Sequence, residues 1–169
     1  EAAGKAVHVY TSPHLVHFNE RVRLAGGLVD NRRLNAALRS VEAINAGRPI
    51  TFFEITTAAA LQLFADTPAD YLLLEVGMGG EFDATNVVAH PLATVVTPVA
   101  IDHVQFLGRT IGEIAVAKAG ILKRGSPAIF GVQSEEGLRV LDARARRLGV
   151  RPFVAGEDFQ GHAEEGRLV

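Results

Sequence analysis

Short apolar runs alternate with longer periodic segments along this chain, and this alternation limits the folds that it can adopt. Five runs predict strands, and they are Ala6–Tyr10, Tyr71–Val76, Ala93–Thr97, Ala128–Val132 and Arg151–Val154. Strands and helices that alternate in this way are typical of an α/β fold in which a mostly parallel sheet is flanked by helices. We therefore predict that fold class for the chain.

The segments between the strands carry the usual signals of helix ends. The helices are predicted from the Asp30 cap to about Ala46, over Phe52–Ala65, from Thr110 to about Leu122, and from Ser134 to near Gly149. Thr110 and Glu113 have the spacing of a capping box. The segment Asn19–Arg23 is polar and predicts a loop or a hairpin, whereas the tail from Gly156 to Val169 is too polar to assign.

The composition excludes several classes of protein. The chain has 169 residues, is 48% hydrophobic and carries a formal charge of -2, which suits one soluble domain with a real core. Its longest basic cluster, Arg144–Arg147, fits a solvated helix face, so we expect no nucleic-acid partner. Without cysteine it has neither disulfides nor thiolate metal sites. No signal peptide or membrane span is evident, so we expect a cytoplasmic protein.

An acidic residue and a histidine follow two successive predicted strands. Glu75 ends an otherwise continuously apolar run, which is typical of a strand buried on both faces, and His103 follows the strand Ala93–Thr97. Ligands of open α/β sheets bind beyond the carboxyl ends of the strands, and a buried carboxylate needs a compensating cation. Glu75 and His103 could therefore share a divalent ion. Alternatively, Glu75 only caps the glycine turn after it and His103 is an ordinary surface histidine.

Two further polar residues are candidates for the same site. Lys118 lies on the helix face that carries Ile114 and Ile121, where it could contact phosphate or carry a modification, or could simply extend its ammonium group to water. Ser12 follows the first strand, next to Thr11, and could supply an oxygen ligand or form an ordinary turn.

Several blocks of the sequence, taken in order, resemble the Mur-ligase superfamily. They are YTSPHLVHFNERVR, TFFEITTAAAL, LLLEVGMGGEFDATNVV, the segment around AIDH and KAGILK, and PAIFGV. The resemblance covers roughly Ala2 to Val154. Its closest match is the folate branch, the folylpolyglutamate synthase/dihydrofolate synthase family, which the SPH-to-NERVR block selects over the cell-wall ligases.

This resemblance implies an ATP-dependent amide ligase of folate biosynthesis and one-carbon metabolism. Its substrates would be dihydropteroate or a folate γ-glutamyl tail, L-glutamate and ATP, and the whole protein is expected to be monomeric. By the resemblance Ser12, Glu75 and His103 match magnesium ligands, and Lys118 matches a carbamylated lysine, so that Lys118 and His103 would be the catalytic residues. Asn86 matches a position near the nucleotide, and His14 and Arg21 match candidate substrate contacts.

The resemblance also implies that the chain, residues 1–169, is part of an ATP-binding central domain. No G-x-x-x-x-G-K-[ST] phosphate loop occurs in it, although the family carries one before the first strand, and the family's C-terminal ligase domain is missing as well. The first residues, Glu1–Gly4, look like the end of a helix. We therefore expect the isolated chain to hydrolyse no ATP. Two alternatives stay open: another Mur-type or P-loop NTPase, and an inactive folate-binding fragment.

Overall fold

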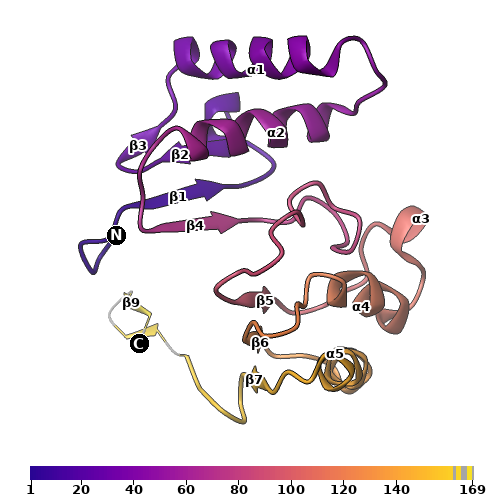
Figure 1. Ribbon diagram of the computed structural model, residues 1–169. Coiled ribbons are helices and arrows are strands. Elements are labelled where there is room, and N and C mark those ends of the chain that lie inside the picture. The colour runs from indigo at the N-terminus through magenta and orange to yellow at the C-terminus, as the bar shows by residue number, and fades with distance from the viewer. Residues whose placement is uncertain (162, 165–166, 169) are drawn as a thin grey trace. The chain divides into compact units, whose positions relative to one another are not determined.

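The computed structural model describes residues 1–161, 163–164 and 167–168, and it divides into two units (Figure 1). Unit 1 comprises Glu1–Gly77 and Asp83–Thr85, and unit 2 comprises Met78–Phe82 and Asn86–Val169. The chain thus passes from one unit to the other between residues 77 and 78, 82 and 83, and 85 and 86. Neither unit is a continuous segment of the sequence.

Unit 1 is built on a four-stranded sheet. Its strands are β1 (Val7–Tyr10), β2 (Val22–Leu24), β3 (Gly27–Leu28) and β4 (Tyr71–Leu74), in the order β3-β2-β1-β4. β1 and β4 are parallel, and Tyr10 lies opposite Leu74 at their carboxyl ends. β2 is antiparallel to both β1 and β3, and the 3-10 helix η1 (Phe18–Arg21) leads into it. The predicted hairpin-like segment is therefore the start of an antiparallel extension of this sheet.

Helices α1 (Asn31–Asn45) and α2 (Phe52–Ala65) lie on the same side of this sheet, as Figure 1 shows. Asp30 caps α1 by accepting a hydrogen bond from the Arg33 backbone N–H at 2.8 Å. The shared core of unit 1 is apolar and is formed by Tyr10, Val22, Leu24, Val29, Leu34, Ala37, Ala59, Ala60, Leu63 and Phe64. α1 packs on α2, and apolar residues of both helices thus share this core with the sheet.

Our prediction that both faces of the strand before Glu75 are buried is wrong for this structure. Tyr71, Leu72 and Leu73 are 47%, 40% and 56% exposed. β4 is the edge strand of its sheet, and α1 and α2 cover one side only. Continuous apolarity therefore identified the strand correctly but not its burial within this chain.

Unit 2 contains a parallel sheet in the order β5-β6-β7, formed by β5 (Thr94–Val96), β6 (Ala128–Phe130) and β7 (Pro152–Val154). The described part of this unit contains the helices α3 (Val104–Leu107), α4 (Ile111–Ala119) and α5 (Glu135–Leu148). The short strands β8 (Ala163–Glu164) and β9 (Arg167–Leu168) form an antiparallel pair. The α/β class is confirmed, and this sheet is parallel as predicted.

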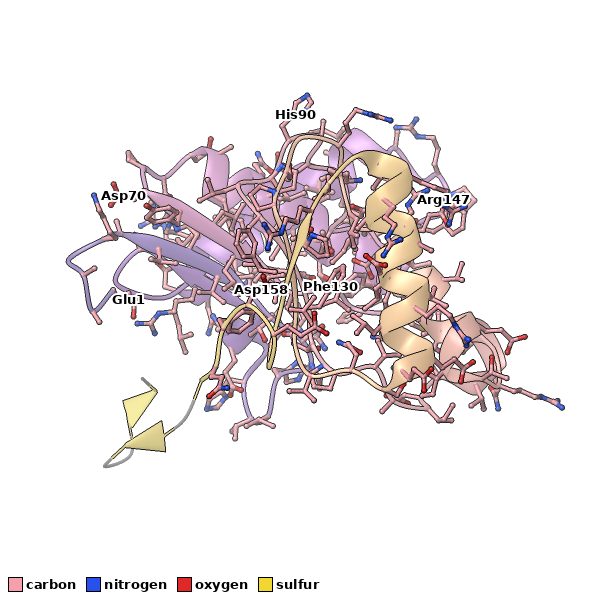
Figure 2. All side chains as sticks on the ribbon, turned by 90° about the horizontal axis from the view of Figure 1, so that it is seen from below. Glu1, Asp70, His90, Phe130, Arg147 and Asp158 are labelled. Atoms are coloured by element: carbon pink, nitrogen blue, oxygen red, sulfur yellow. The ribbon has the colours of Figure 1, made fainter. Side chains whose placement is uncertain are left out.

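The core of unit 2 lies between its sheet and the helices α4 and α5. Ile114, Phe130 and Leu141 are fully buried there. Figure 2 labels both Phe130, which is fully buried, and Arg147, which is exposed on α5. Arg146 and Arg147 are exposed, as predicted of a solvated helix face, whereas Arg144 is half-buried and its Nε is fully buried.

Helix α4 ends earlier than its predicted limit near Leu122. After Ala119 the backbone N–H groups of Gly120, Ile121 and Leu122 each donate to the carbonyl three residues earlier, at 3.2, 3.3 and 3.2 Å. These are the tighter bonds of a 3-10 turn rather than of an α-helix. The sequence periodicity continues through this turn, so it could not locate the helix end.

Candidate functional site

The carboxyl ends of β1 and β4 bring Ser12 and Glu75 together in unit 1. The Ser12 backbone N–H donates a hydrogen bond to Glu75 Oε2 at 2.8 Å, and the Thr11 hydroxyl donates to the same oxygen. The Glu75 N–H in turn donates to the Tyr10 carbonyl at 3.0 Å. Because β1 and β4 are parallel neighbours, their ends meet at one edge of the sheet. Glu75 and His103 were the residues predicted to share a sheet edge, but β4 and β5 lie in different sheets, because β4 pairs with β1 and β5 pairs with β6.

Hard oxygen donors remain available at this edge. Among the described residues neither Glu75 Oε1 nor the Ser12 hydroxyl has a hydrogen-bond partner. Mg²⁺ prefers such donors and is usually held by one or two carboxylates together with waters and substrate phosphates. Ser12 and Glu75 therefore fit a magnesium ion. Glu75 is exposed, however, so the argument that its burial demands a cation does not apply in this structure.

The turn after Glu75 is closed by Asp83, a residue that sequence reasoning missed. Asp83 Oδ2 accepts a hydrogen bond from the Gly77 N–H at 3.0 Å, and Oδ1 accepts from the Thr85 N–H and hydroxyl at 2.9 and 2.6 Å. Thr85 is only 4% exposed. The signal in the sequence was the Asp-x-Thr spacing, which is typical of a side chain that binds the backbone two residues later.

His14 and Arg21 are in direct contact within unit 1. Arg21 Nε donates a hydrogen bond to His14 Nδ1 at 2.9 Å, and the guanidinium carbon lies 5.6 Å from the Phe18 ring centroid and 5.8 Å from that of Phe52. Only 9% of Arg21 is exposed. The Ser12–Pro13 peptide bond that precedes His14 is cis. The two predicted substrate contacts are thus parts of one aromatic and cationic cluster.

His103 lies in unit 2 in a left-handed backbone conformation. Its φ is 49°, and it immediately precedes α3. Asp102 Oδ1 accepts the His103 N–H at 2.7 Å, and Asp102 Oδ2 is 3.7 Å from Nε2 of the ring. A non-glycine residue with positive φ is uncommon, and such residues cluster at functional sites. The exposed imidazole is therefore held on a strained backbone by the residue before it.

Lys118 lies half-buried on α4, and no ion pair among the described residues includes it. The segment Met78–Phe82 approaches α4 beside it, and the Glu81 N–H donates to the Ala117 carbonyl at 3.1 Å. A Cβ on Gly80 would lie 2.8 Å from that carbonyl oxygen and 3.0 Å from that of Lys118. Glycine at this position therefore allows the backbone to approach the lysine-bearing helix closely.

Asn86 also contributes to this packing in unit 2. Its side-chain nitrogen donates hydrogen bonds to the Glu81 carbonyl at 3.1 Å and to the Gly120 carbonyl at 3.3 Å. Its side-chain nitrogen is thus already engaged with the protein backbone. If Asn86 contacts a nucleotide, the side-chain oxygen is the atom available for that contact.

The predicted site residues divide between the two units. Ser12, Glu75, His14 and Arg21 belong to unit 1, whereas Asn86, His103 and Lys118 belong to unit 2. Within the part of the chain that the structure describes, no group of three or more histidine, aspartate and glutamate side chains could hold a metal ion. In unit 1 the metal-binding hypothesis therefore rests on Ser12 and Glu75.

Comparison with known proteins gives close relatives. No family model matches the chain. It is 41% identical over 155 residues to a dihydrofolate synthase/folylpolyglutamate synthase of Bacillus subtilis, an alignment that covers 87% of this chain and 36% of that protein. The corresponding Escherichia coli protein is 43% identical over 130 residues, covering 77% of this chain and 31% of the relative.

Solved structures agree with these sequence relatives. An E. coli FolC in complex with DHPP and ADP matches with a TM-score of 0.89 and 35% identity, over 99% of this chain and 40% of that one. An FPGS–AMPPCP–folate complex matches with a TM-score of 0.86 and 34% identity, over 96% and 42% of the two chains. The chain thus spans less than half the length of these relatives. In its described part no helix is both long enough and apolar enough to cross a membrane.

Proposed function

Since the chain belongs to the folylpolyglutamate synthase/dihydrofolate synthase family over the segment that it spans, we propose that the whole protein is an ATP-dependent amide ligase. It would join L-glutamate to dihydropteroate, to the γ-glutamyl tail of a folate, or to both. The observation that carries the proposal is the pairing of Ser12 with Glu75 at the ends of two parallel strands, in a chain that is 41% identical to such a synthase.

The proposed reaction has two steps. A carboxylate oxygen of the acid substrate attacks the γ-phosphorus of ATP, so that a C–O–P bond forms and ADP leaves. The amine of L-glutamate then attacks the acyl carbon of this acyl phosphate, the amide bond forms, inorganic phosphate leaves and the nitrogen loses a proton. Both steps bring anions together, so charge neutralisation and positioning are what the protein must supply.

The oxygen donors of unit 1 support a metal-assisted version of this reaction. We propose that Ser12 and Glu75 would hold magnesium, which neutralises phosphate charge during phosphoryl transfer when it is bound. His103 of unit 2 is proposed as a further magnesium ligand, as the resemblance of its sequence block implies. The Thr11 hydroxyl and the Ser12 N–H fix Oε2 of Glu75, which leaves Oε1 to face the ligand. Asp83 supports this arrangement by closing the turn that follows Glu75.

We also propose roles for the residues of unit 2 and for the cationic cluster of unit 1. Lys118 would carry a carbamate, formed from its neutral amine and carbon dioxide with release of a proton, which replaces a positive charge with a negative one on α4. Its half-buried position and the absence of an acidic partner among the described residues support this role. Asn86 would contact ATP through its side-chain oxygen, and His14 and Arg21 would contact the acid substrate.

We propose that the enzyme works as a monomer, and in the cytoplasm, where its co-substrate ATP is abundant. Assaying the whole protein separately with dihydropteroate and with a reduced folate tests the proposal. We expect sustained, multiple-turnover formation of ADP only when L-glutamate and one of these acids are present together, because without L-glutamate the reaction stops at the acyl phosphate. ADP release that needs neither acid would instead identify a different type of nucleotide hydrolase.

The role of Lys118 has its own test. We expect Lys118→Ala to lose most of the ligase activity and Lys118→Arg not to restore it, because a guanidinium cannot form this carbamate. Lys5→Ala is the control, since Lys5 is an exposed lysine 3.8 Å from Asp70, and it should keep full activity. Normal turnover by either Lys118 variant would remove this residue from the mechanism.

A further inference from the structure

Arg21 is a buried cation that has no acidic partner. It is 91% buried, since 9% of it is exposed, and no ion pair among the described residues includes it. Its hydrogen bond to His14 uses Nε, so both terminal nitrogens of the guanidinium are without a hydrogen-bond partner in the described part of the chain. These nitrogens are not among the fully buried atoms that lack a partner, so they keep access to solvent and an anion can reach them. Because most of the side chain is removed from water, an anion there would interact more strongly than with a fully exposed arginine.

The surroundings hold the guanidinium in place without neutralising it. His14 Nδ1 accepts the hydrogen bond from Nε, and the rings of Phe18 and Phe52 lie within 6 Å of the guanidinium carbon, at 5.6 and 5.8 Å. Arginine presents its two terminal nitrogens in a planar fork that matches a carboxylate. The fork is thus oriented before any anion binds.

The acid next to Arg21 in the sequence is not available as a partner. Glu20 accepts hydrogen bonds from the N–H groups of Leu15, Val16 and His17, at 2.7, 3.0 and 2.7 Å. These backbone bonds, that from His17 foremost, hold the pKa of Glu20 below its ordinary value. Glu20 therefore serves to order the loop before Arg21, and no ion pair joins the two side chains.

Arg21 is also connected to the proposed metal ligands. The Thr11 N–H donates a hydrogen bond to the Arg21 carbonyl at 3.0 Å, and Thr11 is the residue whose hydroxyl binds Glu75. The unpaired guanidinium and the Ser12–Glu75 pair therefore belong to one hydrogen-bonded assembly within unit 1. A substrate that reaches the metal ligands with one carboxylate could present a second anionic group to Arg21.

We propose that Arg21 binds the carboxylate of the acid substrate that does not react, and that His14, besides its proposed contact with the same substrate, positions the guanidinium of Arg21. This inference rests on the proposed function. A carboxylate held by both nitrogens of a guanidinium has both oxygens engaged and is a poor nucleophile, so Arg21 is unsuited to the carboxylate that attacks ATP. Dihydropteroate has one carboxylate, whereas a folate with a glutamyl tail has at least two. Arg21 therefore favours folates over dihydropteroate.

Binding to the whole protein tests this specificity. Folate and pteroate differ by the glutamyl group, and titration of each into wild-type, Arg21→Gln and Arg21→Lys protein gives the effect of Arg21 on both. We expect Arg21→Gln to weaken folate binding roughly tenfold or more while pteroate binding changes less than about twofold. Arg21→Lys should recover part of the loss, because it keeps the charge but not the fork.

Two further variants separate binding from packing. His14→Ala should raise the KM for a reduced folate and leave kcat nearly unchanged, because it loosens the guanidinium without touching the reacting atoms. Arg23→Gln is the matched control, since Arg23 lies two residues away and pairs with Glu1 at 3.2 Å, and it should bind folate normally. Thermal melts of all variants report whether they fold.

The outcomes distinguish this inference from the proposed function. Equal weakening of folate and pteroate by Arg21→Gln, or no effect on either, would overturn the role of Arg21. A wild-type protein that ligates glutamate to neither acid would defeat the proposed function, and the binding comparison would still decide what Arg21 does.

Discussion

Replacing Gly120 with alanine places two physical effects in opposition. Gly120 has φ -63° and ψ -17°, which any L-residue can adopt, and alanine favours helical backbone over glycine by about 1 kcal/mol. Backbone preference alone therefore predicts a more stable protein. The space around Gly120 predicts the reverse. The alanine Cβ would lie 2.3 Å from the Cβ of Glu81, 2.5 Å from the Cα of Glu81 and 2.8 Å from the backbone nitrogen of Glu81.

These distances are shorter than any normal contact, so the segment Met78–Phe82 must move away from α4. Overpacking of this kind costs about 1–3 kcal/mol. The movement also weakens the 3.1 Å hydrogen bond from the Glu81 N–H to Ala117, which is worth about 1 kcal/mol. After subtraction of the helix preference, we expect the free energy of unfolding to fall by about 1–3 kcal/mol.

Urea denaturation of the whole protein, followed by circular dichroism, measures this loss. Glu81→Gly in the same background should recover little, because Glu81 Cα and its backbone nitrogen remain in the way. Gly125→Ala is the control, because there a new Cβ has no atom within 4 Å. Any loss of stability in this variant comes from the backbone conformation, with φ at +80°, and not from crowding. A Gly120→Ala protein as stable as the wild type would show that this segment does not pack tightly on α4.

Three other predictions concern single side chains. Tyr10→Phe should lower the free energy of unfolding by about 1 kcal/mol, because the buried Tyr10 hydroxyl forms a hydrogen bond with Thr57 Oγ1 at 2.9 Å. In urea denaturation the double variant Tyr10→Phe/Thr57→Val should lose less stability than the sum of the two single variants. Backbone bonds from Arg109 and Thr110 lower the pKa of Glu113, so its stabilisation is present above the unfolded pKa and is lost as the pH falls through the folded value. Melting temperatures between about pH 6 and about pH 3 should therefore depend less on pH in Glu113→Gln, and an unchanged profile would contradict this. His103 has a left-handed backbone, which strains alanine but not glycine, although glycine also raises the entropy of the unfolded chain. We therefore expect His103→Gly to be about 0.5–1 kcal/mol more stable than His103→Ala, while both variants lose ligase activity. Equal melting temperatures of the two variants would refute the strain.

The helix starts could be predicted from the sequence because their signals are local. Asp30, Thr110 and Ser134 each cap a helix through a hydrogen bond to the N–H three residues later. The pairing of β2 with β1 and of β3 with β2 could not be predicted, since these strands are short and add two antiparallel strands to a parallel pair. Burial of β4 was also wrongly predicted, because burial depends on what covers a strand rather than on its own residues.

The same distinction holds for the candidate site. Ser12 and Glu75 could be predicted to lie at a sheet edge because both follow apolar strands, although that these strands are neighbours came only from the structure. The contact between His14 and Arg21 depends on the path of a loop, and no spacing rule gives it. Asp83 acts through the backbone of Gly77, so its role follows from the fold of the turn rather than from its type.

The three passages of the chain between the units have a practical consequence for dissecting the molecule. Met78–Phe82 leaves unit 1 at Gly77, packs with unit 2, and returns at Asp83, which closes the loop by its hydrogen bond to Gly77. No single protease cut or gene-level split point can therefore release either unit intact. Dividing the chain after Gly77 would separate Asp83 and Thr85 from the rest of unit 1. Dividing it after Thr85 would separate Met78–Phe82, which packs on α4, from the rest of unit 2.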